Sequence, residues 1–133
     1  MTLQDYLDSC RRRRWEWGAH DCTLFAADWV RLVTGLDPAA DWRGRYASAD
    51  ECRSRLSNAG GIEAVVSRSM RLAGLAETTD PRPGDVGLVR APTGVEAMGV
   101  ISAICQGDLW VARTVGRVVA APFPLVRAWR VGA

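Results

Sequence analysis

The sequence predicts an α+β fold, with helices in the first part of the chain and an antiparallel sheet in the second. Residues 1–77 place apolar side chains at helical spacing, whereas residues 78–133 contain short β-favouring runs separated by turn formers. The two regions meet at residues 78–84, TTDPRPG, which are dense in proline and other turn-forming residues. We therefore expect N-terminal helices packed on a C-terminal antiparallel β-meander or half-barrel.

Length and composition limit the classes of protein to which the chain can belong. Its 133 residues are expected to form one domain, 1–133, because neither half is large enough to bury its apolar faces alone. No apolar run approaches the roughly 20 residues that span a bilayer, and the N-terminus lacks the pattern of a signal peptide. A formal net charge of +2, without an RNP motif, recognition helix or basic stripe, gives no reason to expect a nucleic-acid partner.

The first predicted helix covers residues 2–14, with Thr2 as its N-cap and an apolar face that includes Leu3 and Leu7. It ends in four consecutive arginines, residues 11–14. Positive charge is favourable at a helix C-terminus, which explains most of them, and contact with an acidic partner is the alternative.

The most apolar helix follows a tryptophan-rich turn, within residues 15–34. Asp21 is a good N-cap, and Gly35 is expected to end the helix. Cys22 falls in the first turn, on the apolar stripe, and has two interpretations. A helix N-terminus favours a thiolate nucleophile, but Cys is also a common small apolar core residue. The four cysteines are widely spaced and the chain has one histidine, so we expect free thiols, no metal site and no cofactor.

The next segment, residues 36–47, is predicted to be a loop and to carry a partner-binding surface. Trp42, Arg43, Arg45 and Tyr46 fall within five residues of it, and such side chains are enriched at binding hot spots. The alternative is that the two aromatic residues cap the domain's own core while the arginines pair with Asp37 or Asp41. Helices are then expected at 48–58 and from 62 to Gly74, followed by strands at 85–90, 95–104, 109–114, 116–120 and 125–131.

Two short motifs suggest a family. Trp17-Gly18 precedes Asp21-Cys22 and Phe25, and the segment PRPGDV at residues 81–86 opens the first expected strand. This pattern resembles the NlpC-type cell-wall cysteine peptidases, which have a papain-like fold. The resemblance implies that Cys22 stands at the position of the family's nucleophile.

The same resemblance fails at the catalytic base. The family's histidine opens a strand of the form His-Val-Gly-Ile, and here that position is Ala97; a second polar position on the next strand is Ala112. A thiol attack needs a base to take its proton and to protonate the leaving amine, which alanine cannot do. His20, the only histidine, is expected to face solvent or to cap the helix, because positions i and i+2 do not face each other. Glu96 borders the missing base, but a carboxylate is a poor base for a thiol at neutral pH.

The degenerate pattern, with the RGRY loop and the terminal RAWRV, also resembles small proteins encoded among phage tail and gene-transfer-agent genes. This resemblance implies a structural component of a tail tip or hub assembly, located in the virion, with other tail or particle proteins as partners. The alternative is a working peptidase that cleaves peptidoglycan peptides with Cys22, which makes peptidoglycan a second candidate partner.

Overall fold

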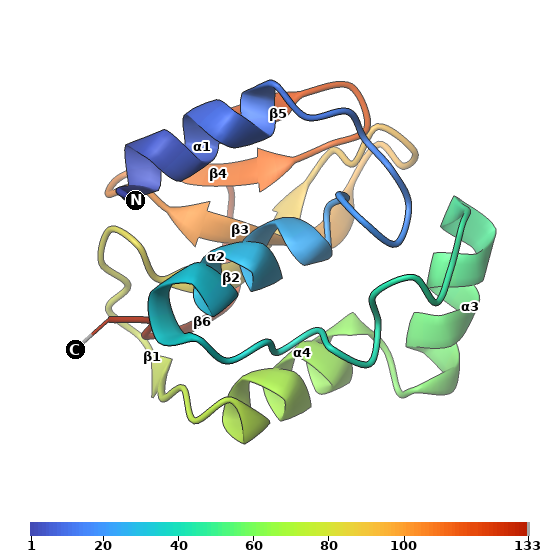
Figure 1. The fold of residues 1–133 in the computed structure, drawn as a ribbon, viewed down its shortest axis with the longest axis horizontal. Helices are drawn as coiled ribbons and strands as arrows, with labels where there is room; N and C mark the ends of the chain where they lie inside the picture. The colour runs from blue at the N-terminus through green and yellow to red at the C-terminus, as the bar shows by residue number, and fades with distance from the viewer. Residues whose placement is uncertain (133) are drawn as a thin grey trace.

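The computed structural model describes residues 1–132 and contains four helices followed by six strands (Figure 1). The helices are α1 (Leu3–Arg11), α2 (Leu24–Thr34), α3 (Ala49–Asn58) and α4 (Ile62–Leu72). The strands are β1 (Glu77–Thr78), β2 (Val86–Ala91), β3 (Gly99–Cys105), β4 (Trp110–Arg113), β5 (Val118–Ala121) and β6 (Leu125–Trp129). The predicted α+β class is confirmed, with the helices preceding an antiparallel sheet.

The strands form one six-stranded antiparallel sheet in the order β1-β6-β2-β3-β4-β5. Strands β2 to β5 follow one another as a meander, as expected. The last strand does not continue it: β6 returns to the free edge of β2, where Trp129 pairs with Val86, and the short β1 pairs with the outer side of β6. The β2–β5 meander is therefore extended at its β2 edge only, first by β6 and then by β1, and β1 was not among the expected strands.

Local capping explains where the helices begin and end. Thr2 caps α1 through a capping box with Asp5, and the hydroxyl of Ser48 accepts the backbone N–H of Glu51 at the start of α3. Gly35 ends α2 in the left-handed conformation, with φ +78°, and donates its N–H to the carbonyl of Arg31. The first helix is shorter than predicted: it ends at Arg11, and the next three arginines, residues 12–14, lie outside it.

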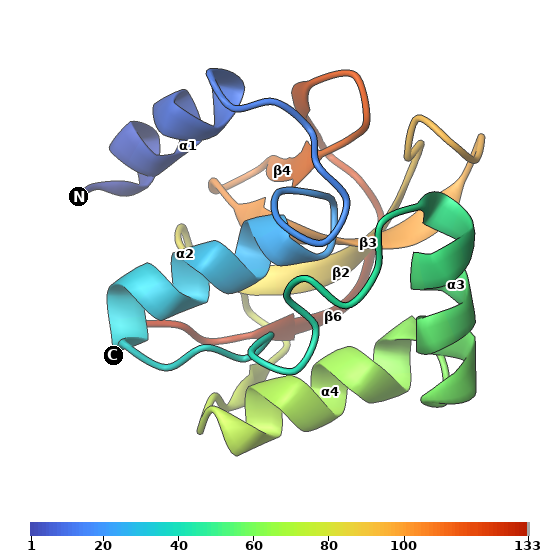
Figure 2. The same cartoon turned by 45° about the vertical axis from the view of Figure 1, so that its right-hand side comes forward.

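The helices pack on one face of the sheet. Figures 1 and 2 place α2 across β2 and β3, with α1 nearer β5 and α4 on the other side of α2. The buried cluster between these layers is formed by apolar residues of α1, α2, α4 and the facing strand positions, among them Leu7, Phe25, Val30, Met70, Leu88 and Ile104. This core fixes the N-terminal end of α2 against β3 and β4.

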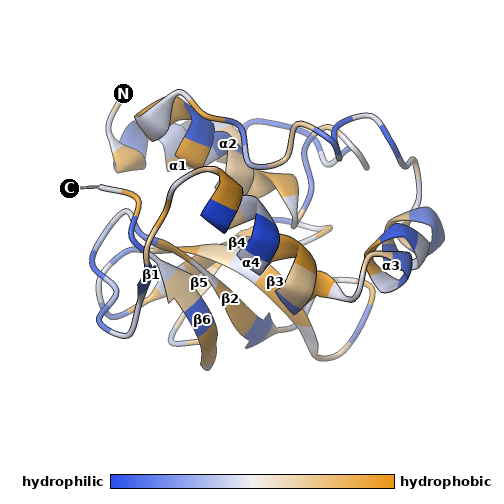
Figure 3. Ribbon diagram, turned by 90° about the horizontal axis from the view of Figure 1, so that it is seen from below, coloured by the Kyte–Doolittle hydropathy of each residue, from blue (hydrophilic) through white to orange (hydrophobic). Residues whose placement is uncertain are grey.

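Helix α3 stands apart from this core. Figure 3 shows it as a largely hydrophilic helix to one side of the sheet, whereas β2 and β3 are strongly hydrophobic. Only Cys52 of α3 is buried. Across residues 1–132 no helix combines the length and the apolar character that a membrane crossing requires.

Candidate functional site

Asp21 organises the turn that leads into α2. Its side chain is fully buried; Oδ1 accepts the N–H groups of Thr23 at 3.0 Å and Leu24 at 2.9 Å. Oδ2 accepts the N–H of Gly18 at 2.9 Å and the hydroxyl of Tyr46 at 2.6 Å. The carboxylate therefore binds backbone N–H groups at the start of α2, although the N-cap residue is Thr23 and not the predicted Asp21. Helix α2 itself begins at Leu24, so Cys22 precedes the helix rather than lying in its first regular turn.

Gly18 lets this turn approach the loop that contains Tyr46. Its φ is +79°, and a Cβ there would collide with the carbonyl oxygen of Tyr46. The carbonyl of Gly18 accepts the N–H of Gly44 at 2.8 Å. Two segments that are separated by α2 are thus held together backbone to backbone, and the position of Cys22 depends on both.

Cys22 lines a groove with a volume of about 120 Å³. The groove lies between the tryptophan turn, α3 and the start of β3, and its walls include Trp15, Trp17, Cys22, Cys52, Arg53, Leu56, Glu96, Val100 and Ile101. The Cys22 residue is partly exposed and packs against the cluster that contains Ile101 and Ala112. Cys22 therefore fits both interpretations in part, since it packs on an apolar cluster and also lines a groove.

The surroundings of Cys22 disfavour its thiolate. Burial, followed by the negative charge of Asp21 and the nearby thiol of Cys52, raises the pKa of Cys22 to about 12. The thiol is therefore neutral at pH 7. The hydroxyl of Thr23 is a polar neighbour of this thiol, with Sγ and Oγ1 4.0 Å apart.

His20 does not face solvent and does not cap the helix, which corrects the sequence expectation. The residue is 1% exposed, and its Nε2 accepts a hydrogen bond from Nε of Arg113 at 3.2 Å. Burial and the charges of Arg13 and Arg113 lower the pKa of His20 to about 4. The imidazole is thus engaged with β4 and is not among the residues that line the Cys22 groove.

The two alanines that replace the family's polar residues lie in different settings. Ala97 is exposed in the loop before β3 rather than on a strand, although its neighbours Glu96 and Gly99 line the groove. Ala112 is fully buried in β4. Glu96 is paired with Arg53 at 3.2 Å, so the carboxylate nearest to the missing base has its own cationic partner.

Ser102 is a site residue that sequence reasoning missed. Its hydroxyl donates to the carbonyl of Cys22 at 2.5 Å and lies 3.3 Å from the carbonyl of Thr23. Ser102 is a buried polar residue within the apolar strand β3. The sequence signal was a single hydroxyl at an inward position of an apolar strand. Because buried polar groups need hydrogen-bond partners, such a residue indicates a contact with another segment.

The four residues proposed from the 36–47 loop do not form one exposed surface. Tyr46 is buried on Asp21, and Arg43 bonds Asp37 through Nε at 2.8 Å and Asp28 through Nη1 at 2.6 Å. Trp42 packs against a small cluster of α2 and loop residues. Arg45 alone is exposed. The alternative in which this loop serves the domain's own packing therefore holds for Trp42, Arg43 and Tyr46.

The residues that could hold a metal ion are scattered. Within residues 1–132 no three His, Cys, Asp or Glu side chains come close enough to form a metal site. The described cysteines are all free thiols, and Cys10, Cys52 and Cys105 are buried.

Comparison with known proteins places the chain in a family. Residues 1–131 match the model of a domain of unknown function (DUF6950), so the chain belongs to that family. Neither the curated proteins nor the solved structures include a match.

Proposed function

We propose that this DUF6950 protein is a catalytically degenerate, NlpC-like domain of papain-like fold that acts as a structural component of a tail tip or hub assembly in a phage or phage-like particle. The hydrogen bond between His20 and Arg113 is the main support for the claim that the site is catalytically degenerate. It removes the chain's only imidazole from the groove in which Cys22 lies.

The chemistry of the groove supports the absence of hydrolysis. A cysteine peptidase needs a thiolate and a group that returns a proton to the leaving amine. Here the pKa of Cys22 is about 12, His20 is neutral and bonded elsewhere, and Glu96 is paired with Arg53. Acyl transfer through Cys22 would therefore have neither an activated nucleophile nor a general acid.

The resemblance to small tail and gene-transfer-agent proteins supports the particle setting. It makes other tail or particle proteins the partners and the virion the location. The groove and the exposed Arg45 offer two surfaces on which such a partner could sit, and neither requires a cofactor.

One observation favours the alternative, an active peptidase that cleaves peptidoglycan peptides. Cys22 is partly exposed in a groove at the N-terminal end of α2 rather than sealed in the core. A bound peptide could exclude water there and supply its own amine as the proton acceptor. This alternative predicts turnover that depends entirely on Cys22.

The two functions are separated by paired assays on the same protein. The purified chain and its Cys22→Ala variant are incubated with soluble peptidoglycan fragments, and new amino groups are counted. Particles purified from cells that carry the gene are then probed for the chain by mass spectrometry. We expect no Cys22-dependent amine release and a fixed amount of the chain per particle. Amine release that is lost in Cys22→Ala refutes the degenerate site, and absence from purified particles refutes the structural role.

A further inference from the structure

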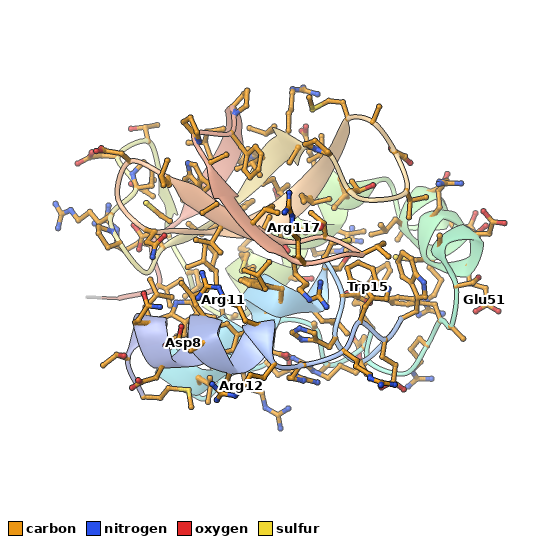
Figure 4. All side chains as sticks on the ribbon, turned by 90° about the horizontal axis from the view of Figure 1, so that it is seen from above. Asp8, Arg11, Arg12, Trp15, Glu51 and Arg117 are labelled. Carbon is orange, nitrogen blue, oxygen red and sulfur yellow. The ribbon has the colours of Figure 1, made fainter. Side chains whose placement is uncertain are left out.

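A second concave site shares Trp15 with the Cys22 groove. It is a cavity of about 430 Å³ between the C-terminal end of α1 and the turn that joins β4 to β5. Five of its ten lining residues are arginines, namely Arg11, Arg13, Arg14, Arg113 and Arg117, and none is acidic. Figure 4 shows Arg11 on the sheet side of α1 and Arg117 above it, whereas Arg12 lies on the far side of the helix.

The most unusual of these arginines is Arg113. It is 4% exposed, and within residues 1–132 it forms no ion pair with a carboxylate. Its guanidinium donates only to neutral acceptors: His20 Nε2, the carbonyl of Arg13 at 3.3 Å and the carbonyl of Thr114. The ring of Trp15, 5.5 Å away, adds a cation–π contact. Buried charges in proteins are normally paired, so this cation lacks the counter-charge its position calls for.

The other arginines leave a net positive charge at the cavity. Arg11 is paired with Asp8 at 3.1 Å and Arg13 with Asp28 at 3.5 Å. Arg14 and Arg117 form no ion pair with any described carboxylate. The helix C-terminus accounts for Arg11 and Arg12 but not for Arg113, which lies in β4, or for Arg117, which lies in the turn between β4 and β5.

Trp15 lines both this cavity and the Cys22 groove. Its indole Nε1 is buried without an acceptor among the described residues. An oxyanion with several acceptor oxygens would supply the counter-charge that the guanidinium groups of Arg14, Arg113 and Arg117 lack. Guanidinium groups bind phosphate and carboxylate oxygens in a forked geometry, and several converging arginines favour the more highly charged group.

We propose that this cavity, lined by Arg14, Arg113 and Arg117, is a binding site for a phosphate-type oxyanion. The chemistry recognised is the phosphate group itself, whether free or carried as a phosphodiester on a polymer. This site shares only Trp15 with the Cys22 groove, and the proposal does not depend on the function proposed above.

The binding test uses the full chain in a phosphate-free buffer. Orthophosphate and pyrophosphate are titrated by isothermal calorimetry at constant ionic strength, with chloride as the reference salt. We expect saturable binding with one site per chain and tighter binding of pyrophosphate. The Arg14→Ala/Arg117→Ala variant should bind on the order of tenfold more weakly or worse, because two charge-assisted contacts are removed.

The matched control is Arg12→Ala/Arg45→Ala, which removes the same charge from exposed residues outside the cavity. It should bind as the unmodified chain does. Equal weakening in both double variants would show a general charge effect and overturn the proposal, as would no saturable binding of either anion. Thermal melting of each variant verifies that it is folded.

Two further ligands identify the source of the anion. A short single-stranded oligonucleotide that binds, and loses binding in Arg14→Ala/Arg117→Ala alone, supports a phosphodiester as the source. Oligonucleotide binding that this variant leaves unchanged, with no response to the small anions, overturns the cavity as the site. An acidic peptide that binds more tightly than pyrophosphate would replace phosphate by carboxylate and likewise overturn the proposal.

Discussion

Nε of Arg113 donates a hydrogen bond to Nε2 of His20 at 3.2 Å, across 93 residues of sequence. Because Nε2 is the acceptor, the neutral ring carries its hydrogen on Nδ1, and that nitrogen has no partner among the described residues. Protonation of Nε2 would break this hydrogen bond and place a second cation beside a buried guanidinium. Burial, with the charges of Arg13 and Arg113, therefore keeps His20 neutral, and the bond to Arg113 keeps its imidazole from serving Cys22.

This pairing predicts a stability that falls in mild acid. The pKa of His20 is about 4 in the folded protein and about 6.5 in the unfolded chain. As the pH is lowered, the unfolded chain therefore binds the extra proton first. The stabilisation is complete above pH 6.5 and is lost as the pH falls towards 4. The full shift corresponds to an upper limit of about 3 kcal/mol. Urea unfolding between pH 7 and pH 5 measures the loss.

The control for this prediction is His20→Gln, which cannot titrate in this range. Since the chain has one histidine, the difference between the two pH profiles isolates His20 from the carboxylates. Equal slopes in the two proteins between pH 7 and pH 5 would contradict the prediction. An imidazole resonance that titrates near pH 6.5 in the folded protein would do so as well.

Cys22 is expected to react slowly with alkylating agents. Burial and Asp21 raise the pKa of this thiol to about 12, so its thiolate fraction at pH 8 is far below that of a free cysteine, whose pKa is about 8.5. The rate of iodoacetamide addition at Cys22, followed by peptide mass spectrometry, should rise continuously up to pH 9. A plateau below pH 8.5 would reveal an activated thiolate and reverse the interpretation of the groove.

Tyr46→Phe should destabilise the fold by about 1–3 kcal/mol, because it removes a hydrogen bond to the buried carboxylate of Asp21. Tyr6→Phe is the matched control. It also deletes one buried tyrosine hydroxyl, but the acceptor is the neutral carbonyl of Phe25 at 2.5 Å, and about 0.5–1.5 kcal/mol is expected. Denaturant unfolding gives both values. A loss in Tyr46→Phe no greater than in Tyr6→Phe would show that Asp21 does not depend on this bond.

Local signals were sufficient to predict the helices and most strands. Thr2, Gly35 and Ser48 act through backbone groups within four residues, so their effect can be read from the sequence alone. The return of β6 to β2 and the addition of β1 depend on pairing across about 40 residues or more, which no local pattern records. The strand at 125–131 was therefore predicted without its pairing to β2, and β1 was not predicted.

The site was predicted less well for the same reason. Asp21 was identified as a cap, but its second oxygen binds Tyr46, 25 residues away, and that contact moves Tyr46 from the surface to the interior. His20 is buried because Arg113 reaches it from β4. A polar side chain is normally buried only where it has a hydrogen-bond partner. When that partner lies far along the chain, the sequence alone does not identify it.

The final prediction concerns what remains of the partner surface proposed for the 36–47 loop. Trp42 is half-buried on the cluster of Leu24, Ala27 and Ala39, and the guanidinium of Arg55 lies 5.3 Å from its ring. Trp42→Ala should therefore cost roughly 1–3 kcal/mol, less than the full burial of a tryptophan. Arg45 is exposed, so Arg45→Ala should change stability by less than about 0.5 kcal/mol.

Measuring incorporation into particles alongside melting separates a contact from a packing role. If Arg45 contacts a neighbouring tail protein, Arg45→Ala lowers incorporation while its melting temperature stays unchanged. Arg71→Ala, which removes an equally exposed arginine from α4, serves as the control and should incorporate normally. Normal incorporation of Arg45→Ala, or an equal loss in Arg71→Ala, would contradict a partner contact at Arg45. The loop would then serve only the domain's own packing, in which Tyr46 binds Asp21, Arg43 bridges Asp28 and Asp37, and Trp42 packs on the start of α2.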